Sequence, residues 1–351
     1  MNLVNQNIQR PLIIAGPCSA ESKEQLLTTA QLLKDHISIF RAGVWKPRTR
    51  PNSFEGIGKE ALSWLQDVKK ETDLKVATEV ATPEHVEHCL DAGIDVLWLG
   101  ARTTVNPFYV QEIAEALRGV DIQVMIKNPL HPEVSLWIGA IERMYKVGIN
   151  NLTAIHRGFF TLEQSVFRNE PKWEIPIELK RQHPSLPLIC DPSHISGAPE
   201  MLFEVSQTAL DLNMDGLMIE SHYNPRVALS DAKQQITPKD AIDLISKLVL
   251  RSASNQDQNF LEQLELLRSN IDEVDSKLLE IVLQRTNLVK EIGRFKKENN
   301  VTILQIERWF EILKSRQNWA KHLNPKMVEE LFELIHKHSV LIQSKIMNNN
   351  G

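Results

Sequence analysis

Two sets of side chains with different chemistry recur along the first 250 residues of the sequence. The first set combines a thiol, an imidazole and two carboxylates, and consists of Cys18, His194, Glu220 and Asp231. Such a mixture of sulfur, nitrogen and oxygen donors suits a borderline divalent transition metal better than an ion that prefers oxygen alone. Taken singly, each residue also fits a buried thiol, a loop histidine or a surface acid. The predicted metal site therefore requires that the fold bring all four together.

The second set consists of cations, and its members are Arg41, Lys46, Arg48, Arg102, Lys127 and Arg157. Arginine binds carboxylate or phosphate through paired hydrogen bonds, whereas lysine acts as a point charge. Six cations gathered in one empty site would repel one another, so the set predicts an anionic ligand. The alternative is that they are solvated loop cations.

Eight short apolar or β-branched runs separate these residues. They cover 12–16, 39–45, 75–80, 96–100, 124–127, 152–156, 187–191 and 216–221, with helical patterns between them. Runs that are apolar almost throughout are typical of parallel strands covered on both faces. Eight strand–helix units over about 240 residues predict an α/β fold of the (β/α)8 barrel type, with a doubly wound open sheet as the alternative. In such a barrel the catalytic groups come from the carboxyl ends of the strands and from the loops that follow, and all ten residues stand there.

The sequence changes character after residue 251. A polar segment at 252–259 predicts a linker between a domain over 1–251 and a domain over 260–351. The second domain is expected to be all-α, with helices at about 260–298, 304–321 and 325–347. A helix of nearly 40 residues has too few partners in a three-helix unit, which predicts a homodimer through this domain.

The overall composition narrows the function classes. Lysine and arginine number 40 and aspartate and glutamate 45, which gives a net charge of -5 and no bulk attraction to nucleic acid or membranes. Three scattered cysteines do not form a disulfide framework, and the first residues lack the pattern of a secretory signal. We therefore expect a cytoplasmic protein that binds neither nucleic acid nor a membrane.

Several collinear motifs carry a family resemblance over about residues 8–250. They are AGPCSAES (15–22), RAGVWKPRT (41–49), GAR (100–102), IK (126–127), HRG (156–158), DPSHISG (191–197) and ESHYNPRVALSD (220–231). This region resembles the type I beta class of 3-deoxy-D-arabino-heptulosonate 7-phosphate (DAHP) synthases. The family condenses phosphoenolpyruvate with erythrose 4-phosphate at the start of the shikimate pathway.

The resemblance implies a role for each residue of the two sets. Cys18, His194, Glu220 and Asp231 would bind a divalent metal ion, Mn²⁺ or a similar one, and Arg41, Lys46, Arg102, Lys127 and Arg157 would hold phosphoenolpyruvate, with the two lysines also as candidates for proton transfer. Arg48 and Thr49 would bind the phosphate of the aldose. The rival within this fold is a 3-deoxy-octulosonate 8-phosphate synthase, in which asparagine stands at the position of Pro47. The Lys46–Pro47 pair therefore favours the four-carbon aldose.

The long C-terminal helix carries a third group of cations. Arg285 and Lys296 are 11 residues apart, about three turns, so they face nearly one side, whereas Arg268 lies about 100° around the axis. Arg268 is thus expected to reach the pocket of a second subunit. Ser339 and Gln343, four residues apart, share one face of the last helix. Routine surface charge is the alternative.

The helical region resembles the all-helical chorismate mutases over roughly 260–347. The matching segments are 266–285, GRFK (293–296), IERW (306–309) and HSVLIQ (338–343). The resemblance implies that Arg268, Arg285 and Arg308 bind the carboxylates of chorismate, while Lys296 and Gln343 donate to the breaking ether bond on the way to prephenate, without a cofactor. Gln305 and Trp309 depart from the family's usual aspartate and glutamate. The alternative is a monofunctional synthase whose helical domain only dimerises and senses a feedback ligand.

Overall fold

The computed structural model describes residues 11–47, 53–162, 165–252, 254–319 and 322–348. The chain divides into two compact units, Met1–Ala253 and Ser254–Gly351. Within the described ranges, no helix is both long enough and apolar enough to cross a membrane.

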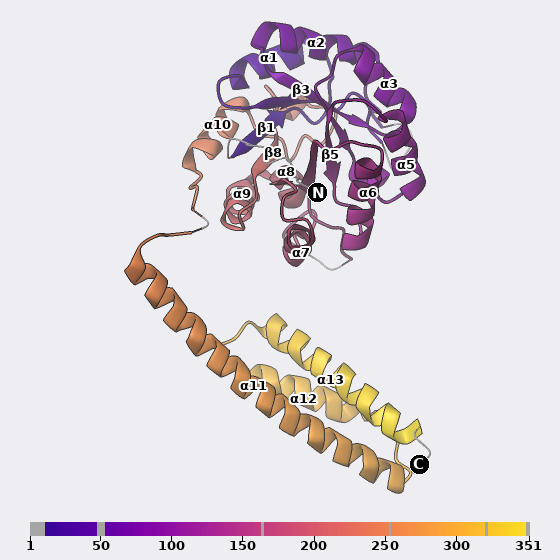
Figure 1. Ribbon diagram of the computed structural model, residues 1–351, viewed down its shortest axis with the longest axis vertical. Helices are drawn as coiled ribbons and strands as arrows, with labels where there is room; N and C mark the ends of the chain where they lie inside the picture. The colour runs from indigo at the N-terminus through magenta and orange to yellow at the C-terminus, as the bar shows by residue number, and fades with distance from the viewer. Residues whose placement is uncertain (1–10, 48–52, 163–164, 253, 320–321, 349–351) are drawn as a thin grey trace. The chain divides into compact units, whose positions relative to one another are not determined.

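The first unit is a closed barrel of eight parallel strands that pair in chain order, with β1 returning to β8 (Figure 1). The strands are β1 (Leu12–Gly16), β2 (Ile39–Arg41), β3 (Lys75–Val80), β4 (Val96–Leu99), β5 (Gln123–Lys127), β6 (Leu152–His156), β7 (Leu188–Cys190) and β8 (Gly216–Glu220). The structure thus confirms the predicted (β/α)8 barrel and excludes the open sheet. Every predicted strand is present.

The second strand is much shorter than predicted, whereas the others differ from their predicted runs by at most one residue at either end. The apolar run over 39–45 forms β2 only as far as Arg41, because the chain then turns toward the loop that follows β1. Gly43 N donates to the carbonyl of Cys18 at 3.2 Å, and Ala20 N donates back to the Gly43 carbonyl at 3.0 Å. The departure from the barrel brings the loops after β1 and β2 into contact on its carboxyl rim.

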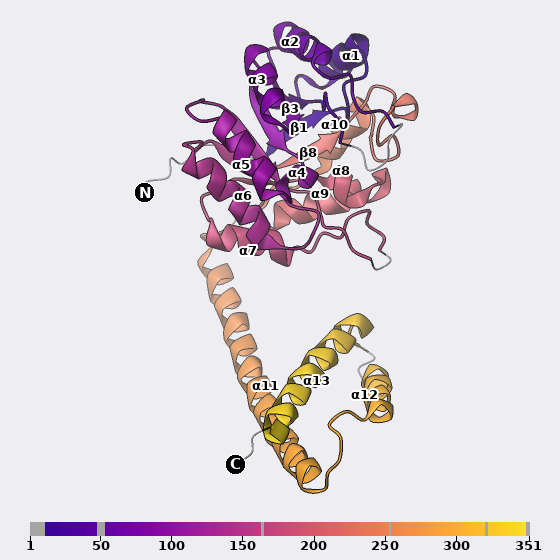
Figure 2. The ribbon, with the colours of Figure 1, turned by 90° about the vertical axis from the view of Figure 1, so that its right-hand side faces the viewer.

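Helices surround the barrel on its outside (Figures 1 and 2). The main ones are α1 (Lys23–Leu33), α2 (Glu60–Thr72), α3 (Pro83–Asp91), α5 (Pro107–Ala116), α6 (Val134–Lys146), α7 (Glu174–Gln182), α9 (Leu202–Asp211) and α10 (Pro238–Lys247). The short segments α4 (Ala101–Thr104), α8 (Pro192–Ser196), η1 (Pro199–Met201) and η2 (Pro225–Val227) lie in loops after β4, β7 and β8. The two short helices α4 and α8 carry Arg102 and His194, respectively, onto the rim.

Two apolar layers hold the barrel together. The larger one lies between the strands and the surrounding helices. The smaller one fills the barrel interior and includes Ile14, Trp98, Met125 and Met218. Successive strand residues point alternately inward and outward, so each strand supplies alternate residues to the two layers. The interior is therefore packed, and the site must lie above it on the rim.

The second unit contains α11 (Gln258–Glu298), α12 (Ile306–Trp319) and α13 (Pro325–Asn348). α11 begins two residues before the predicted start, because the Asp257 carboxylate caps it by accepting a hydrogen bond from Phe260 N at 2.8 Å. α13 runs alongside the C-terminal half of α11 in the same direction. A Cβ at Gly293 would lie 3.2 Å from Gln343 Cγ, so a glycine suits this close approach.

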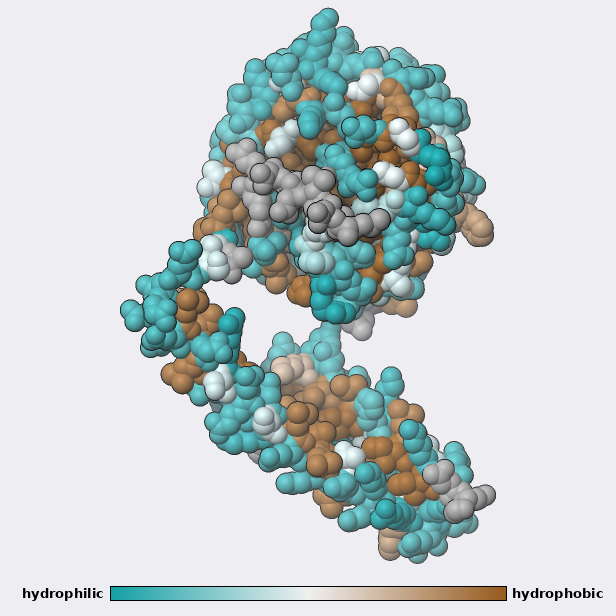
Figure 3. Space-filling model, in the orientation of Figure 1, coloured by the Kyte–Doolittle hydropathy of each residue, from teal (hydrophilic) through white to brown (hydrophobic). Residues whose placement is uncertain are grey.

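The N-terminal half of α11 exposes many apolar side chains. Leu266, Leu267, Ile271, Val274, Leu278 and Leu279 are each more than half exposed. Figure 3 shows apolar side chains at the surface of this unit. A helix packed only within one chain would bury such residues. This half of α11 therefore leaves an apolar surface uncovered within the described part of the unit.

Candidate functional site

The four predicted metal ligands converge on the rim of the barrel above β1, β7 and β8. Single donor atoms of Cys18, Glu220 and Asp231 all lie within 4.8 Å of one another. His194 joins them from α8, with Nε2 at 3.8 Å from Glu220 Oε1. Glu220 is fully buried, and its Oε1 has no hydrogen-bond partner in the described part of the chain. Arg41 Nη2 lies 3.3 Å away and partly balances its charge, and an oxygen left without a hydrogen bond fits a bound cation.

Backbone geometry sets the position of two of these ligands. Gly16 has a φ of 150°, and a Cβ there would lie 2.1 Å from the carbonyl oxygen of Arg41. Only glycine allows this approach, which leads the chain to Cys18 next to β2. Asp231 adopts a φ of 45°, a conformation that aspartate tolerates better than most residues.

The thiol of Cys18 depends on its neighbours for its ionisation. Burial and the Glu220 carboxylate raise the pKa of Cys18 to about 12, although Lys46 Nζ lies only 3.0 Å from Sγ. Thiolate is the form that binds metals, and a divalent cation deprotonates a coordinating thiol. The donor set is therefore one that a metal ion would complete.

A carboxylate behind His194 fixes the orientation of its ring. His194 Nδ1 lies 2.8 Å from Asp191 Oδ2, and the backbone N of His194 donates to Asp191 Oδ1 at 3.1 Å. Burial lowers the pKa of the imidazole, which favours its neutral form. A neutral ring protonated on Nδ1 presents the lone pair of Nε2 to Glu220, which is the usual arrangement of a metal-binding histidine.

Two of the predicted cations are buried beside carboxylates. Arg41 Nη2 lies 3.3 Å from Glu220 Oε1, and Lys127 Nζ lies 2.7 Å from Asp191 Oδ2. Both stand over the indole of Trp98, at 4.8 Å and 5.9 Å from its centroid. Nε and Nη1 of Arg41 are buried without a hydrogen-bond partner within the described residues. These donors could bind an anion.

Arg157 is held by neutral groups. Its Nη1 donates to Asn169 Oδ1 at 2.7 Å. Burial, together with the nearby cations Arg168 and Arg102, lowers the pKa of Arg157 to about 10. The surroundings thus destabilise the charged form of the guanidinium, and a bound anion would stabilise it.

Residues from both sets open into one cavity of about 850 Å³. Lys46, Arg102, Lys127, Arg157, His194 and Asp231 line it. Arg48 and Thr49 lie outside the described residues. The cavity joins the cation set to the metal set, as an anionic substrate next to a metal ion requires.

Sequence reasoning missed several residues of this site. Trp98, whose Nε1 donates to Glu79 Oε2 at 2.9 Å, reads in the sequence as an ordinary core residue. Arg168 pairs with Asp231 at 3.2 Å from the loop after β6, and Asn169 follows it. Asp191 stands in the DPSH motif, three residues before His194 in a helical turn, and that spacing was a usable signal.

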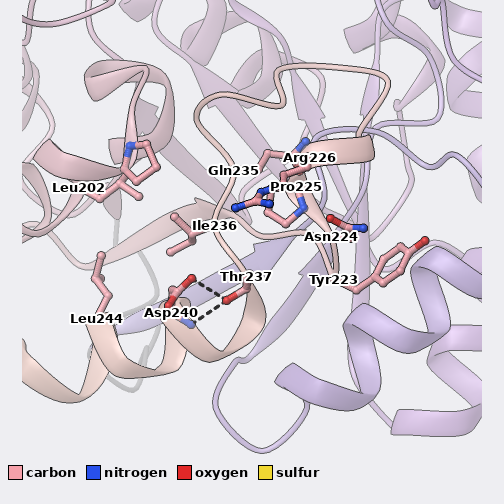
Figure 4. Close-up of a pocket in the computed structure, with 11 residues that line it drawn as sticks. Leu202, Tyr223, Asn224, Pro225, Arg226, Gln235, Ile236, Thr237, Asp240 and Leu244 are labelled. Atoms are coloured by element: carbon pink, nitrogen blue, oxygen red, sulfur yellow. Dashed lines mark hydrogen bonds between the residues drawn. The ribbon is translucent and has the colours of Figure 1, made fainter.

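A second cavity of about 710 Å³ lies between α9, α10 and the segment after β8 (Figure 4). The Asp240 carboxylate there accepts a hydrogen bond from Thr237 Oγ1 at 2.6 Å. Arg226 is the single cation among the eleven residues drawn, and it is exposed. This cavity lacks the convergent charged groups of the first one.

The helical unit brings part of its predicted set together. Arg285 Nη1 donates to Ser339 Oγ at 2.8 Å, and Lys296 Nζ donates to the carbonyl of Ile303 at 2.6 Å. Gln343 is buried, and its Oε1 has no hydrogen-bond partner among the residues that the structure describes.

The structure does not join Arg268 and Arg308 to this group. Their side chains are 63% and 68% exposed and pair with Glu265 and Glu311 on their own helices. Trp309, which departs from the family pattern, stacks on His336 with 4.0 Å between ring centroids. The stack fastens α12 to α13 at a position where the family usually has a carboxylate.

Known protein families match both the barrel region and the helical region of the chain. Residues 4–253 match the DAHP synthetase I family, and residues 267–344 match chorismate mutase type II. A phospho-2-dehydro-3-deoxyheptonate aldolase of Thermotoga maritima is 29% identical over 225 residues, 64% of this chain and 64% of its own length. A crystal structure of the DAHP synthase of that organism has a TM-score of 0.62 at 26% identity, covering 70% of this chain and 71% of its own.

The relatives also include enzymes of the rival class. A 2-dehydro-3-deoxyphosphooctonate aldolase of Vesicomyosocius okutanii subsp. Calyptogena okutanii is 26% identical over 282 residues, which is 71% of this chain and 94% of its own length. The family match covers well over half of the chain. The chain belongs to the DAHP synthetase I family and carries a chorismate mutase type II region at its C-terminal end.

Proposed function

We propose that the barrel catalyses the metal-dependent condensation of phosphoenolpyruvate with erythrose 4-phosphate to DAHP and inorganic phosphate. The observation that supports this most is the meeting of a cation set and a metal-binding set in one cavity. Lys46 links the two sets, since it lines the cavity and its Nζ lies 3.0 Å from Cys18 Sγ. The family match supports the same reaction.

The cations would orient the substrate and stabilise charge. Arg102, Lys127 and Arg157 would bind the carboxylate and phosphate of phosphoenolpyruvate, with Arg41 and Lys46 deeper in the site. The fixed enol presents C3 to the aldehyde carbon, water adds at C2, and phosphate leaves. The same cations stabilise the negative charge that develops. We assign the proton transfers to Lys46 and Lys127.

Cys18, His194, Glu220 and Asp231 would hold the divalent ion, Mn²⁺ or a similar one. When bound, such an ion supplies Lewis-acid polarisation of the aldehyde oxygen. Asp191 holds the His194 ring in place, and Gln234 Nε2 donates to Glu220 Oε2 at 2.6 Å. These contacts would fix the orientation of two of the proposed ligands, His194 and Glu220, as a preorganised site requires.

The substrate assay tests the proposal. Purified full-length protein with Mn²⁺ should consume phosphoenolpyruvate with erythrose 4-phosphate and release phosphate. Arabinose 5-phosphate, the five-carbon aldose, should react at least ~10-fold more slowly, because Pro47 stands where the rival family has asparagine. A preference for the five-carbon aldose would reassign the barrel to the rival class.

For the helical unit we propose the rearrangement of chorismate to prephenate. Arg285, with Arg268 and Arg308, would bind the substrate carboxylates, and Lys296 and Gln343 would donate to the breaking ether oxygen. A pericyclic reaction needs only a compact conformer and cations beside that oxygen, without a metal or a nucleophile. The buried Gln343 and the Arg285–Ser339 contact support this assignment. Loss of chorismate, followed with the full-length protein, tests it against a unit that only binds and senses ligands.

We further propose that the helical domain, taken as 260–351 after a linker at 252–259 and a barrel domain over 1–251, forms a homodimer. The exposed apolar residues in the first half of α11 support this. A partner's helix laid on that half would also allow Arg268 to approach the pocket of the other copy.

A further inference from the structure

Asn169 lies where the two halves of the barrel site meet. It is 6% exposed and comes from the loop between β6 and α7. Its Oδ1 accepts a hydrogen bond from Arg157 Nη1 at 2.7 Å, and its Nδ2 donates to the carbonyl oxygen of His194 at 2.6 Å. One amide thus contacts a cation of the anion-binding set and the backbone of a metal-binding histidine.

The backbone around Asn169 is fixed on both sides. Asn169 N donates to the carbonyl of Ile195 at 3.1 Å. On the other side, Gly158 has a φ of 75°, and a Cβ there would lie 2.7 Å from the Asn169 carbonyl oxygen. Because both neighbouring loops hold the backbone, the side-chain amide has a defined direction.

An amide suits this position better than a carboxylate would. A carboxylate next to Arg157 would anchor the guanidinium equally well but would neutralise the charge that an anionic substrate needs. An amide oxygen orients the guanidinium and leaves the charge in place, and the amide NH₂ matches the His194 carbonyl. Arg41 and Lys127, in contrast, already have carboxylate partners.

We propose that Asn169 is a positioning residue that aims Arg157 at phosphoenolpyruvate and at the same time holds the His194 loop for metal binding. The inference rests on the proposed condensation, because it takes the ligands of Arg157 and His194 from it. It predicts that a single change at Asn169 weakens two different ligands.

The test measures the Kd of Mn²⁺ and the Kd of phosphoenolpyruvate separately on the full-length protein. Asn169→Ala should weaken phosphoenolpyruvate binding by about 10-fold, the scale of one lost hydrogen bond to a charged group. Mn²⁺ binding should weaken by roughly 10-fold, as for loss of other contacts behind metal ligands. Asn150→Ala, an exposed asparagine in the loop before β6, is the matched control and should change neither.

Asn169→Asp distinguishes positioning from mere packing. The aspartate has nearly the same shape, so a residue that only fills space would tolerate it better than alanine. The proposal predicts the opposite order for phosphoenolpyruvate, with a larger loss in Asn169→Asp than in Asn169→Ala, because the new carboxylate neutralises Arg157 and faces the His194 carbonyl. Equal binding of both ligands by the wild type and the two variants, or a milder effect of aspartate, would overturn it. A wild type that binds neither ligand would instead refute the proposed condensation.

Discussion

The two candidate sites hold their charges in opposite ways. In the barrel, Arg41 and Lys127 are 1% and 5% exposed and lie beside the buried carboxylates of Glu220 and Asp191. In the helical unit, Arg268 and Arg308 are more than 60% exposed and pair with glutamates one turn away. Exposed pairs of this kind contribute little to stability, so these arginines can exchange partners freely.

The difference follows from the two architectures. A closed barrel brings eight loops to one rim, so a single chain can bury and preorganise a site. Three helices in one chain leave much of α11 exposed. Within the described residues, Arg285 and Ser339 meet between α11 and α13, and Gln343 lies beside Gly293. Lys296 instead donates to the carbonyl of Ile303 after α11. The described part of the barrel thus holds buried, preorganised charges, whereas Arg268 and Arg308 stand apart from the other predicted residues of the helical site.

The largest expected effect is at the barrel's metal set. His194→Ala should reduce the condensation rate by on the order of 10³-fold, because several kcal/mol of transition-state stabilisation depend on the metal. Chorismate turnover in the same sample should change by less than ~2-fold. His36→Ala, at an exposed histidine, is the control. Near-normal condensation by His194→Ala would remove this residue from the site.

The next effect belongs to the helical site. Lys296→Ala should lower chorismate turnover by roughly 10²-fold, the scale of losing one preorganised donor at a developing charge. Lys290→Ala, an exposed lysine on the same helix, should leave the rate unchanged. If the two variants behave alike, the pocket is elsewhere or the unit does not catalyse the reaction.

A third prediction concerns the exposed half of α11. Ile271→Glu or Leu278→Glu should weaken dimerisation by ~10-fold or more. Each change replaces an apolar side chain whose burial in the proposed interface would contribute about 1.5–3 kcal/mol. Light scattering over a concentration series measures the change, with Lys277→Gln as the control. An unchanged mass at every concentration would show that this face is not the interface.

A fourth prediction uses His156, which is buried against the rings of Phe159 and Trp173. Burial, together with Arg157, lowers its pKa to about 3. The unfolded state therefore binds a proton between pH 6.5 and 3 that the folded state does not, and the free energy of unfolding falls as the pH falls.

From pH 7 to pH 5 this histidine should account for a loss of about 2 kcal/mol. Chemical unfolding of the barrel at both pH values measures it. In His156→Asn the difference between the two pH values should shrink by that amount, whatever the variant's stability at pH 7. The same slope in variant and wild type would contradict the assignment.

The barrel and its rim were predictable from the regular alternation of apolar strands and helices along the chain. That alternation determines the order of the strands in the barrel and which loops lie on its carboxyl rim. Eight apolar runs, with residues such as Cys18 and Lys127 at or just beyond their carboxyl ends, suffice to predict the rim. The end of β2 was not predictable, since Gly43 leaves the ladder for a contact with the Cys18 loop. That contact joins segments whose sequences carry no sign of it.

The supporting residues of the site were missed for a related reason. In the sequence, Trp98 looks like an ordinary residue of an apolar strand. Its ring lies against Arg41 because its side chain points into the barrel interior. Asn169 lies 12 residues beyond Arg157 in a loop, and the loop's path decides that the two side chains meet. The spacing of residues in the sequence predicts which side chains are neighbours on one helix or strand. It does not predict contacts between side chains on two different loops.

If the chain carries two chemically independent sites, of which the barrel alone uses a metal, a metal titration separates them. Chelator-treated full-length protein is titrated with Mn²⁺, and both reactions are assayed in each sample. We expect no condensation without metal, a rise that saturates near one Mn²⁺ per barrel, and a constant rate of chorismate rearrangement throughout. Full condensation by the metal-free protein, or a rearrangement rate that follows the metal, would show that the sites are not as proposed.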